Sequence, residues 1–411
     1  MGQSGTNEVA DAASGEHDAQ PDAVQFDLFG MPVKAAPAVS KASAQPGVSG
    51  GESTESATCV DEAAAPPADS PKKRRARDVV AAPPSPDLLA LAAGLPPQIH
   101  LGTSTWSFPG WNGIVYGDEY SNTKLSREGL GAYSAHPLLK TVSIDRSFYQ
   151  ALTVTEYLRY AQQVPEHFRF IVKAPMTITD ATVRAERGEP VSMNPCFLNA
   201  QMAIDDFVTP CLEGLGAKAG ALVFQLSPLP DQMLAQPAAF IERLGEFLHA
   251  LPALPDGTHY AIEIRDGSLL TPRFIRTLKA AGVRYCVGIH ARMPDPLRQA
   301  AALALLDGDA PTGPLIVRWS LHGGFKYEQA KAKYEPFNQL IDPDPSTRAA
   351  LAELAARYAL AGQPVVIAIN NKAEGSAPLS CLELARAIIE AYTRQAHEHE
   401  DAHEPPAADP D

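Results

Sequence analysis

Short apolar runs alternate with stretches of helical spacing along the chain between residues 98 and 392. The runs are rich in β-branched and aromatic residues, and the stretches between most of them are long enough for helices. Eight such units with no sign of a second core predict a TIM-type (β/α)₈ barrel. An open doubly wound sheet is the alternative. The expected strands lie near 99–104, 141–147, 168–173, 220–226, 259–265, 283–288, 315–322 and 365–370.

The run at 316–324 contains polar residues that are unusual for a buried strand. In an extended strand, side chains alternate between faces, so Arg318, Ser320 and His322 would share one face opposite the apolar residues. A buried arginine is costly unless partners or a ligand neutralise its charge, so other polar groups are expected to converge on it. Gly323 and the glycine after it allow the backbone to approach a ligand closely.

Polar residues recur near the C-terminal ends of seven expected strands, on the inward face. In barrels of this type, ligand sites lie at that end of the strands. Each residue taken singly could instead belong to an ion pair that only fills the interior. The set is Ser104, Asp145, Lys173, Gln225, Glu263, Arg265, Arg318, His322 and Asn370.

The charges of this set favour a small anionic or phosphate-bearing ligand. Lys173, Arg265 and Arg318, with His322 as a further candidate cation, outnumber the two carboxylates at Asp145 and Glu263. A divalent metal would prefer several histidine and carboxylate ligands with few cations nearby, so no metal and no cofactor are expected.

Candidate catalytic roles follow from the same set. Glu263 or Asp145 can serve as a general base and His322 as an acid, with the cations stabilising an oxyanion or a phosphate. The loops at 322–324 and 370–376 are rich in small residues and follow the last two strands, where barrels often hold phosphate; tight turns alone would also explain their glycines. Hydrolase and lyase chemistry both stay open, as does binding without turnover.

Residues 1–97 and 393–411 differ from the rest in composition. They are polar, rich in Ala and Pro or in acids, and have too few apolar residues to form a core, so a long disordered N-terminal tail and a short acidic C-terminal tail are expected. The tails carry −6 and −5 of the formal net charge of −14, which leaves −3 for residues 98–392. A nearly neutral barrel neither requires nor excludes nucleic acid as a partner.

An apolar island interrupts the N-terminal tail at residues 25–29. Gln25, Leu28 and Phe29 resemble the peptide by which proteins bind the bacterial sliding clamp, with Phe26 in place of the usual leucine. A chance cluster is the alternative. A basic run at 72–77 is either solvated linker or a non-specific phosphate contact.

Cysteine usage and hydropathy bear on the compartment. The five cysteines are odd in number and form no Cys-x-x-Cys pair, so neither a disulfide framework nor a zinc site is indicated. The N-terminus lacks an apolar signal core, and no run approaches the roughly 20 residues that span a bilayer. A cytoplasmic protein without a membrane segment is expected.

From about residue 98 to 390 the chain resembles the YecE-like family, catalogued as domain of unknown function 72. The resemblance implies a TIM-type barrel and adds Trp106, Tyr149 and Asn371 to the ligand-binding candidates. Its matching pieces are Gly102 to Trp106 with Trp111, Val142 to Tyr149, Phe168 to Pro175, Phe224 to Leu226, Glu263 to Arg265, Val317 with Arg318, Leu321 to Gly323, and Asn370 with Asn371.

The chain departs from the family pattern at two places. Ser143 and Asp145 stand where the family usually has glutamate and asparagine, and Asp266 begins a stretch where relatives commonly have His-x-Ser-Trp. Because the family's activity is not established, three hypotheses stay open. They are an enzyme or binding module for an anionic ligand, a nucleic-acid-associated accessory protein recruited to the sliding clamp, and a metal-dependent endonuclease-like barrel.

Overall fold

A computed structural model describes residues 78–185, 189–323 and 325–401 of the chain. The expected docking motif at 25–29 and the basic run at 72–77 lie outside the described residues. Among the described residues, no helix is long and apolar enough to cross a membrane.

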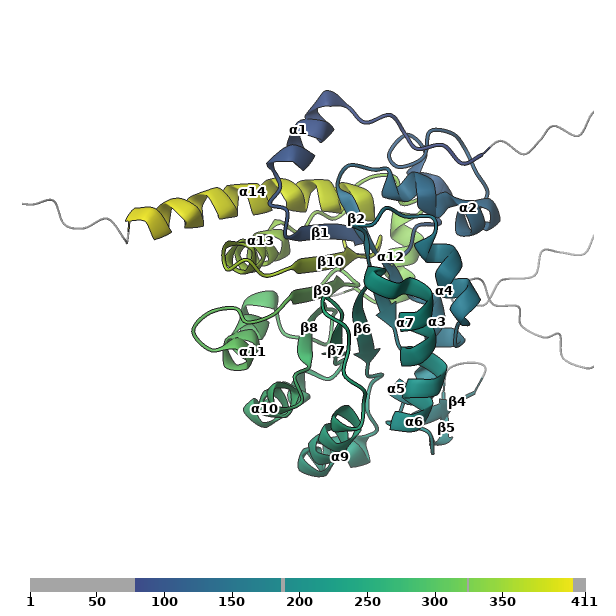
Figure 1. Ribbon diagram of the computed structural model, residues 1–411, viewed down its shortest axis with the longest axis vertical. Coiled ribbons are helices and arrows are strands. Elements are labelled where there is room, and N and C mark those ends of the chain that lie inside the picture. The colour runs from purple at the N-terminus through teal and green to yellow at the C-terminus, as the bar shows by residue number, and fades with distance from the viewer. Residues whose placement is uncertain (1–77, 186–188, 324, 402–411) are drawn as a thin grey trace, which may run out of the picture. The chain divides into compact units, whose positions relative to one another are not determined.

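Eight parallel strands form the centre of the fold. They are β1 (Ile99–Thr103), β2 (Leu139–Ile144), β3 (Arg169–Lys173), β6 (Ala219–Gln225), β7 (His259–Glu263), β8 (Arg284–Ile289), β9 (Leu315–Trp319) and β10 (Val365–Ile369). They close into a barrel in the order β1-β10-β9-β8-β7-β6-β3-β2 (Figure 1). The predicted TIM-type barrel is therefore confirmed. A separate antiparallel pair, β4 (Thr182–Arg184) and β5 (Pro190–Met193), lies outside the barrel.

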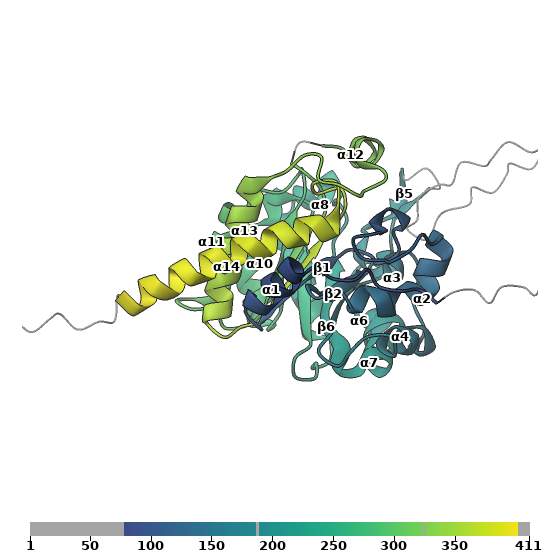
Figure 2. The same cartoon turned by 90° about the horizontal axis from the view of Figure 1, so that it is seen from above.

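Helices surround the strands (Figures 1 and 2). Several begin at capping side chains; for example, Thr153 and Glu156 form a reciprocal capping box. The α-helices are α1 (Pro86–Gly94), α2 (Asn122–Ser134), α3 (Arg146–Tyr149), α4 (Val154–Ala161), α5 (Met176–Thr179), α6 (Ala200–Ala203), α7 (Thr209–Leu215), α8 (Asp231–Leu234), α9 (Pro237–His249), α10 (Pro272–Ala280), α11 (Pro296–Asp307), α12 (Tyr327–Tyr334), α13 (Pro345–Leu360) and α14 (Ala377–Asp401). Short 3₁₀ turns cover Pro109–Trp111, Gly216–Lys218 and Gly267–Leu269, and a π-helical turn covers Ile204–Val208.

The inside of the barrel is a packed apolar layer with a polar layer beyond it. Alternate residues of the strands point inward. The apolar layer is formed by small and branched side chains from six strands, which fill the narrow interior. Its members are Ile171, Ala221, Val223, Ala261, Cys286, Ile316, Val366 and Ala368. Toward the C-terminal ends of these strands, the next inward positions are polar except for Gly288, so the candidate site lies directly on this layer.

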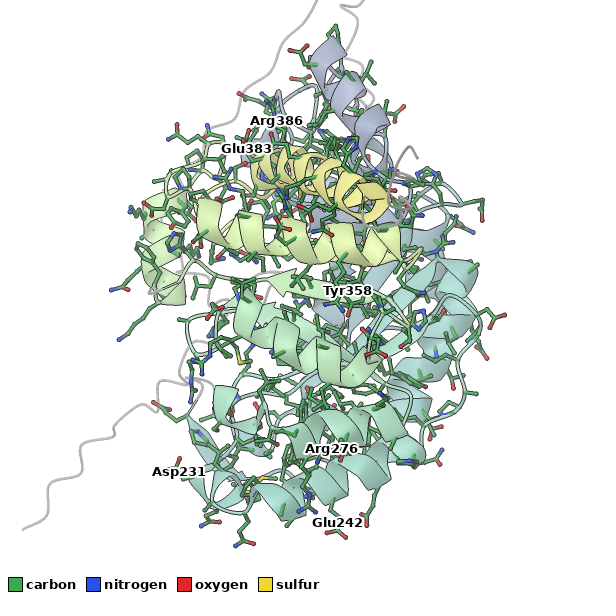
Figure 3. The ribbon with its side chains drawn as sticks, turned by 90° about the vertical axis from the view of Figure 1, so that its left-hand side faces the viewer. Asp231, Glu242, Arg276, Tyr358, Glu383 and Arg386 are labelled. Carbon is green, nitrogen blue, oxygen red and sulfur yellow. The ribbon has the colours of Figure 1, made fainter. Side chains whose placement is uncertain are left out.

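Two elements extend beyond the expected limits of 98 and 392. Helix α1 precedes β1 and contacts α14, as both ribbon views show (Figures 1 and 2). Helix α14 continues to Asp401 and runs beside α13. Figure 3 shows the two helices, with Tyr358 of α13 and Arg386 of α14 labelled. The apolar spacing of residues 86–94 was hidden within a segment rich in Ala and Pro, so composition alone did not reveal the helix.

The seventh barrel strand ends earlier than expected. The predicted strand at 315–322 stops at Trp319, after which the backbone bends, and the amide of His322 donates to the carbonyl of Lys372 at 2.9 Å. The alternation that would have placed His322 on the face of Arg318 therefore does not reach His322. Ser320, His322 and Gly323 interrupt the apolar pattern that would keep this segment in the sheet.

Candidate functional site

Arg318 is the centre of the polar layer at the C-terminal end of the barrel. Its side chain is 5% exposed, and both terminal nitrogens are paired. Nη1 donates to Glu263 Oε2 at 2.5 Å and to Gln225 Oε1 at 3.1 Å, and Nη2 donates to both carboxylate oxygens of Asp145 at 2.9 Å. Polar groups therefore converge on this arginine, as predicted. The side chains of Glu263, Gln225 and Asp145 neutralise its charge without a ligand.

Glu263 and Gln225 also hold the second arginine of the site. Arg265 Nη2 donates to Gln225 Oε1 at 2.8 Å and lies 2.8 Å from Glu263 Oε1. The second contact has ion-pair distance without hydrogen-bond geometry, since Glu263 Oε1 has no hydrogen-bond partner among the described residues. Arg265 Nη1 is also buried and without a hydrogen-bond partner within the described part of the chain. This guanidinium nitrogen is thus a buried donor that the described residues leave unsatisfied.

Electrostatics keep this pair of arginines and Glu263 charged. Burial by itself would raise the pKa of Glu263, but the guanidinium groups of Arg265 and Arg318 hold that pKa below its ordinary value. Burial also opposes the charge of Arg318, and Asp145 and Glu263 nevertheless raise its pKa. Burial lowers the pKa of Arg265, although an arginine stays protonated at any physiological pH.

Asp145 follows β2 and is the more accessible carboxylate. Its side chain is 25% exposed, whereas that of Glu263 is fully buried. Ser143, which precedes it by two residues on the same inward face, donates a hydrogen bond to Asp145 Oδ1 at 2.6 Å. Ser143 and Asp145, the two residues at which this segment departs from the family pattern, therefore bond to each other. Ser143 and Arg318 together fix the orientation of the Asp145 carboxylate.

Lys173 ends β3 as a buried residue, and its amine has no polar partner among the residues that the structure describes. The residue is 7% exposed, and Nζ lies 3.4 Å from the centre of the Phe148 ring. Within the described residues, no hydrogen bond or ion pair reaches Nζ. Ser147 donates to the carbonyl of Lys173 at 2.6 Å and so ties α3, which carries Phe148, to the end of β3.

The amine of Lys173 has a pKa of about 7. Burial is the largest cause of this lowering, and the charges of Arg318 and Arg265 lower the pKa further. Asp145 and Glu263 act in the opposite direction. The face of the Phe148 ring also favours the ammonium form, but a ring contact of this kind contributes only about 0.5–2 kcal/mol. A large share of Lys173 is therefore a neutral amine at pH 7.

Ser104 and Asn370 pair with each other at the same end of the barrel. Asn370 Nδ2 donates to Ser104 Oγ at 2.8 Å, and Asn370 Oδ1 accepts from the amide of Lys372 at 3.0 Å. These bonds join the ends of β1 and β10 and leave the hydroxyl proton of Ser104 available as a donor. Ser104 and Asn370, two of the polar residues predicted at the strand ends, are thus brought together.

Trp106 and Asn371 have hydrogen-bond partners within the protein. Trp106 is buried in its loop, where Nε1 donates to the carbonyl of Leu125 at 3.1 Å and the ring packs 5.1 Å from Tyr160. Asn371 Oδ1 accepts from Trp111 Nε1 at 3.3 Å and from the amide of Ala377 at 2.8 Å. The loop after β10 is buried along most of its length and packs against the barrel.

His322, Gly323 and Tyr149 lie on the rim. His322 Nδ1 is 2.8 Å from the carbonyl of Gly323, and its ring packs edge-on against Phe325 at 5.3 Å. Gly323 is exposed. Tyr149 is 48% exposed and packs against Phe148 at 5.2 Å. The geometry does not bring His322 into the cluster around Arg318, so the cationic surplus there is smaller than expected.

His290 completes the ring of strand ends and was not predicted. Gly288 of β8 points inward, because a methyl group there would lie 3.5 Å from Glu263, and His290 continues the same period of two. Burial lowers the pKa of His290 to about 4, and the charge of Arg265 contributes. The expected strand stopped at residue 288, and extending it by two residues would have revealed this histidine.

The balance of charge in the cluster depends on Lys173. Three cations, Lys173, Arg265 and Arg318, face the two carboxylates of Asp145 and Glu263. The surplus is one positive charge when the amine is protonated and none when it is neutral. In residues 78–185, 189–323 and 325–401, no group of three or more His, Cys, Asp or Glu side chains is placed to hold a metal ion.

Comparisons with known proteins give one family and several distant structures. The family model described as "Protein of unknown function DUF72" matches residues 100–406. A DUF72 family protein from Enterococcus faecalis V583 is 16% identical, with a TM-score of 0.45 over 72% of this chain and 95% of that chain. One from Thermotoga maritima MSB8 is also 16% identical, with a TM-score of 0.44 over 73% and 99%. A monooxygenase from Streptomyces bottropensis is 12% identical, with a TM-score of 0.34 over 72% and 99%.

The family match includes residues of all eight barrel strands. The matched residues begin within β1 and end beyond α14, so they include the strands that carry the polar layer. A search of curated proteins finds no match. The chain therefore belongs to the DUF72 family, as the resemblance of its strand-end motifs predicted.

Proposed function

We propose that the C-terminal end of this barrel binds a small anionic or phosphate-bearing ligand, with Arg265 as the group that pairs with it. The observation that carries the proposal is the buried Nη1 of Arg265, which has no hydrogen-bond partner within the described residues. An unsatisfied buried donor on a charged group costs more than about 1–3 kcal/mol. A carboxylate or phosphate oxygen would satisfy it with a charge-assisted hydrogen bond.

The other cations have different roles in this proposal. Arg318 is fully occupied by Glu263, Gln225 and Asp145, so it holds the cluster together. The amine of Lys173 is a second donor without a polar partner in the described part, and it favours anion binding when protonated.

The two carboxylates also have different roles in this proposal. Glu263 is the buried counter-ion of both arginines, and Asp145 is the carboxylate that a ligand can reach. We assign Asp145, rather than Glu263, as the candidate general base. His322 is left out of this site because it packs against Phe325 at the rim.

Calorimetric titration with inorganic phosphate at constant ionic strength tests the proposal. Wild type should bind phosphate, and Arg265→Gln should weaken binding about 10-fold to 150-fold, the range for removing a charge-assisted hydrogen bond. Arg276→Gln is the matched control, because Arg276 is exposed on the outer helix α10 (Figure 3). Equal affinities of the two variants, or no heat from phosphate with wild type, would contradict it.

A second proposal concerns the tail rather than the barrel. Gln25, Leu28 and Phe29 match the sliding-clamp-binding peptide, which would recruit the chain to DNA as an accessory protein. A pull-down with purified clamp should retain the full chain, lose it on Phe29→Ala and keep it on the control Val33→Ala. Absence of binding by wild type would end this proposal, and the barrel proposal would be unaffected.

A further inference from the structure

The amine of Lys173 combines features that the anion-binding role does not use. It stands at the C-terminal end of a barrel strand, is 7% exposed, and has no polar partner within the described residues. An ammonium ion in such a place would ordinarily be paired with a carboxylate. Here the nearby carboxylates are taken by Arg318 and Arg265.

The surroundings favour the neutral, nucleophilic form of this amine. Burial and the two arginines lower the pKa of Lys173 to about 7, so roughly half of the molecules carry a neutral amine at that pH. An ordinary exposed lysine is neutral in fewer than about one molecule in a thousand at pH 7. Desolvation beside other cations is a known way to activate a lysine toward carbonyl compounds.

Phe148 covers the amine and gives the site one apolar wall. The ring lies 3.4 Å from Nζ and is held there because Ser147 donates to the carbonyl of Lys173. The charged groups that act on the amine are Asp145, Glu263, Arg265 and Arg318. A ligand with a small carbon skeleton and one anionic group fits this combination of an apolar wall and an unsatisfied guanidinium.

We propose that Lys173 forms a Schiff base with a small carbonyl compound that carries a carboxylate or phosphate group. This inference rests on the proposed anion-binding function, since Arg265 would hold the anionic group while Nζ reaches the carbonyl carbon.

The chemistry balances without any oxidant or reductant. The nitrogen lone pair forms a C–N bond as the carbonyl π electrons move to oxygen, and one proton passes from nitrogen to that oxygen. The C–O bond then breaks, the hydroxyl leaves as water with a proton that comes from the solvent and that the Asp145 carboxylate can relay, and the product is a protonated imine. Asp145 lies at the accessible edge of the cluster, with a side chain that is 25% exposed.

Reductive trapping on the full chain tests the proposal. The protein is incubated with pyruvate or dihydroxyacetone phosphate, reduced with sodium borohydride, digested and mapped by mass spectrometry. We expect a stable secondary-amine adduct at Lys173, at least about tenfold above that at the exposed Lys279, with a yield that rises through pH 7. Lys173→Met should lose this adduct, and site mapping in wild type keeps the test valid if that variant does not fold.

The outcomes separate this inference from the anion-binding proposal. Phosphate binding without an adduct at Lys173 overturns the Schiff base and leaves anion binding intact. An adduct at Lys173 that forms equally well with the neutral dihydroxyacetone supports the reactive amine and contradicts the role of Arg265. Adducts spread evenly over surface lysines, without enrichment at Lys173, also overturn the inference.

Discussion

Arg318 and Glu263 form an ion pair inside the barrel across an intervening strand. Arg318 lies on β9 and Glu263 on β7, and the residue of β8 that registers with Arg318 is Gly288. The guanidinium reaches past this glycine to Glu263 Oε2 at 2.5 Å. The pair therefore spans a strand that contributes neither charge.

Loss of the buried carboxylate should be costly. Glu263→Gln leaves the charges of Arg265 and Arg318 without their shared counter-ion, and removing one partner of a buried pair typically costs about 3–5 kcal/mol. We expect urea denaturation to show a loss of that size. The control is Glu128→Gln, which breaks the Lys124–Glu128 pair on the surface of α2 and should cost less than about 0.5 kcal/mol. A similar small loss in both variants would refute the central role of Glu263.

The two inward glycines should tolerate a methyl group differently. At Gly102 a Cβ atom would lie 1.8 Å from the carbonyl oxygen of Thr141, a backbone group that cannot move freely. At Gly288 it would lie 3.5 Å from Glu263, an ordinary contact. We expect thermal unfolding to show a loss of about 3 kcal/mol or more for Gly102→Ala and of under about 1 kcal/mol for Gly288→Ala. The reverse order would contradict the packing described for these strands.

Lys173 should make stability rise with pH above neutrality. The pKa is about 7 in the folded chain and near 10.5 when unfolded, so between these values the unfolded chain binds more protons. The free energy of unfolding then increases by at most about 1.4 kcal/mol per pH unit, and below pH 7 the two states bind this proton equally.

The measurement is urea unfolding at pH 6, 7, 8 and 9. The difference between wild type and Lys173→Met should be constant up to about pH 7 and then grow in favour of wild type. Lys279→Met, an exposed lysine on α10, serves as the control and should show no such growth. A parallel course for all three proteins would show that the amine of Lys173 titrates normally.

His290 should stay neutral to well below its usual pH. Burial and the charge of Arg265 lower its pKa to about 4, so its imidazole is expected to be uncharged at pH 6. Two-dimensional NMR of the ring nitrogens, with His290→Gln to assign the signal, measures this directly. A midpoint near 6.5 would place the ring in solvent and away from Arg265.

The sequence by itself determined the barrel and most of the polar layer. Alternation of inward and outward residues is a local property, so the positions of Asp145, Lys173, Glu263 and Arg318 at strand ends could be predicted from their runs. The same rule would have found His290 if the expected strand at 283–288 had been extended by two residues.

The tertiary structure decided which of these groups pair and which stay available. Asp145 and Arg318 are 173 positions apart in the chain, and only the closure of the barrel brings their side chains to 2.9 Å. Likewise, Asn371 accepts a hydrogen bond from Trp111, and the amide of His322 donates to the carbonyl of Lys372, so contacts between distant segments fixed the positions of these loops. Local periodicity specifies the face on which a side chain lies, whereas its partners depend on three-dimensional contacts that no local pattern encodes.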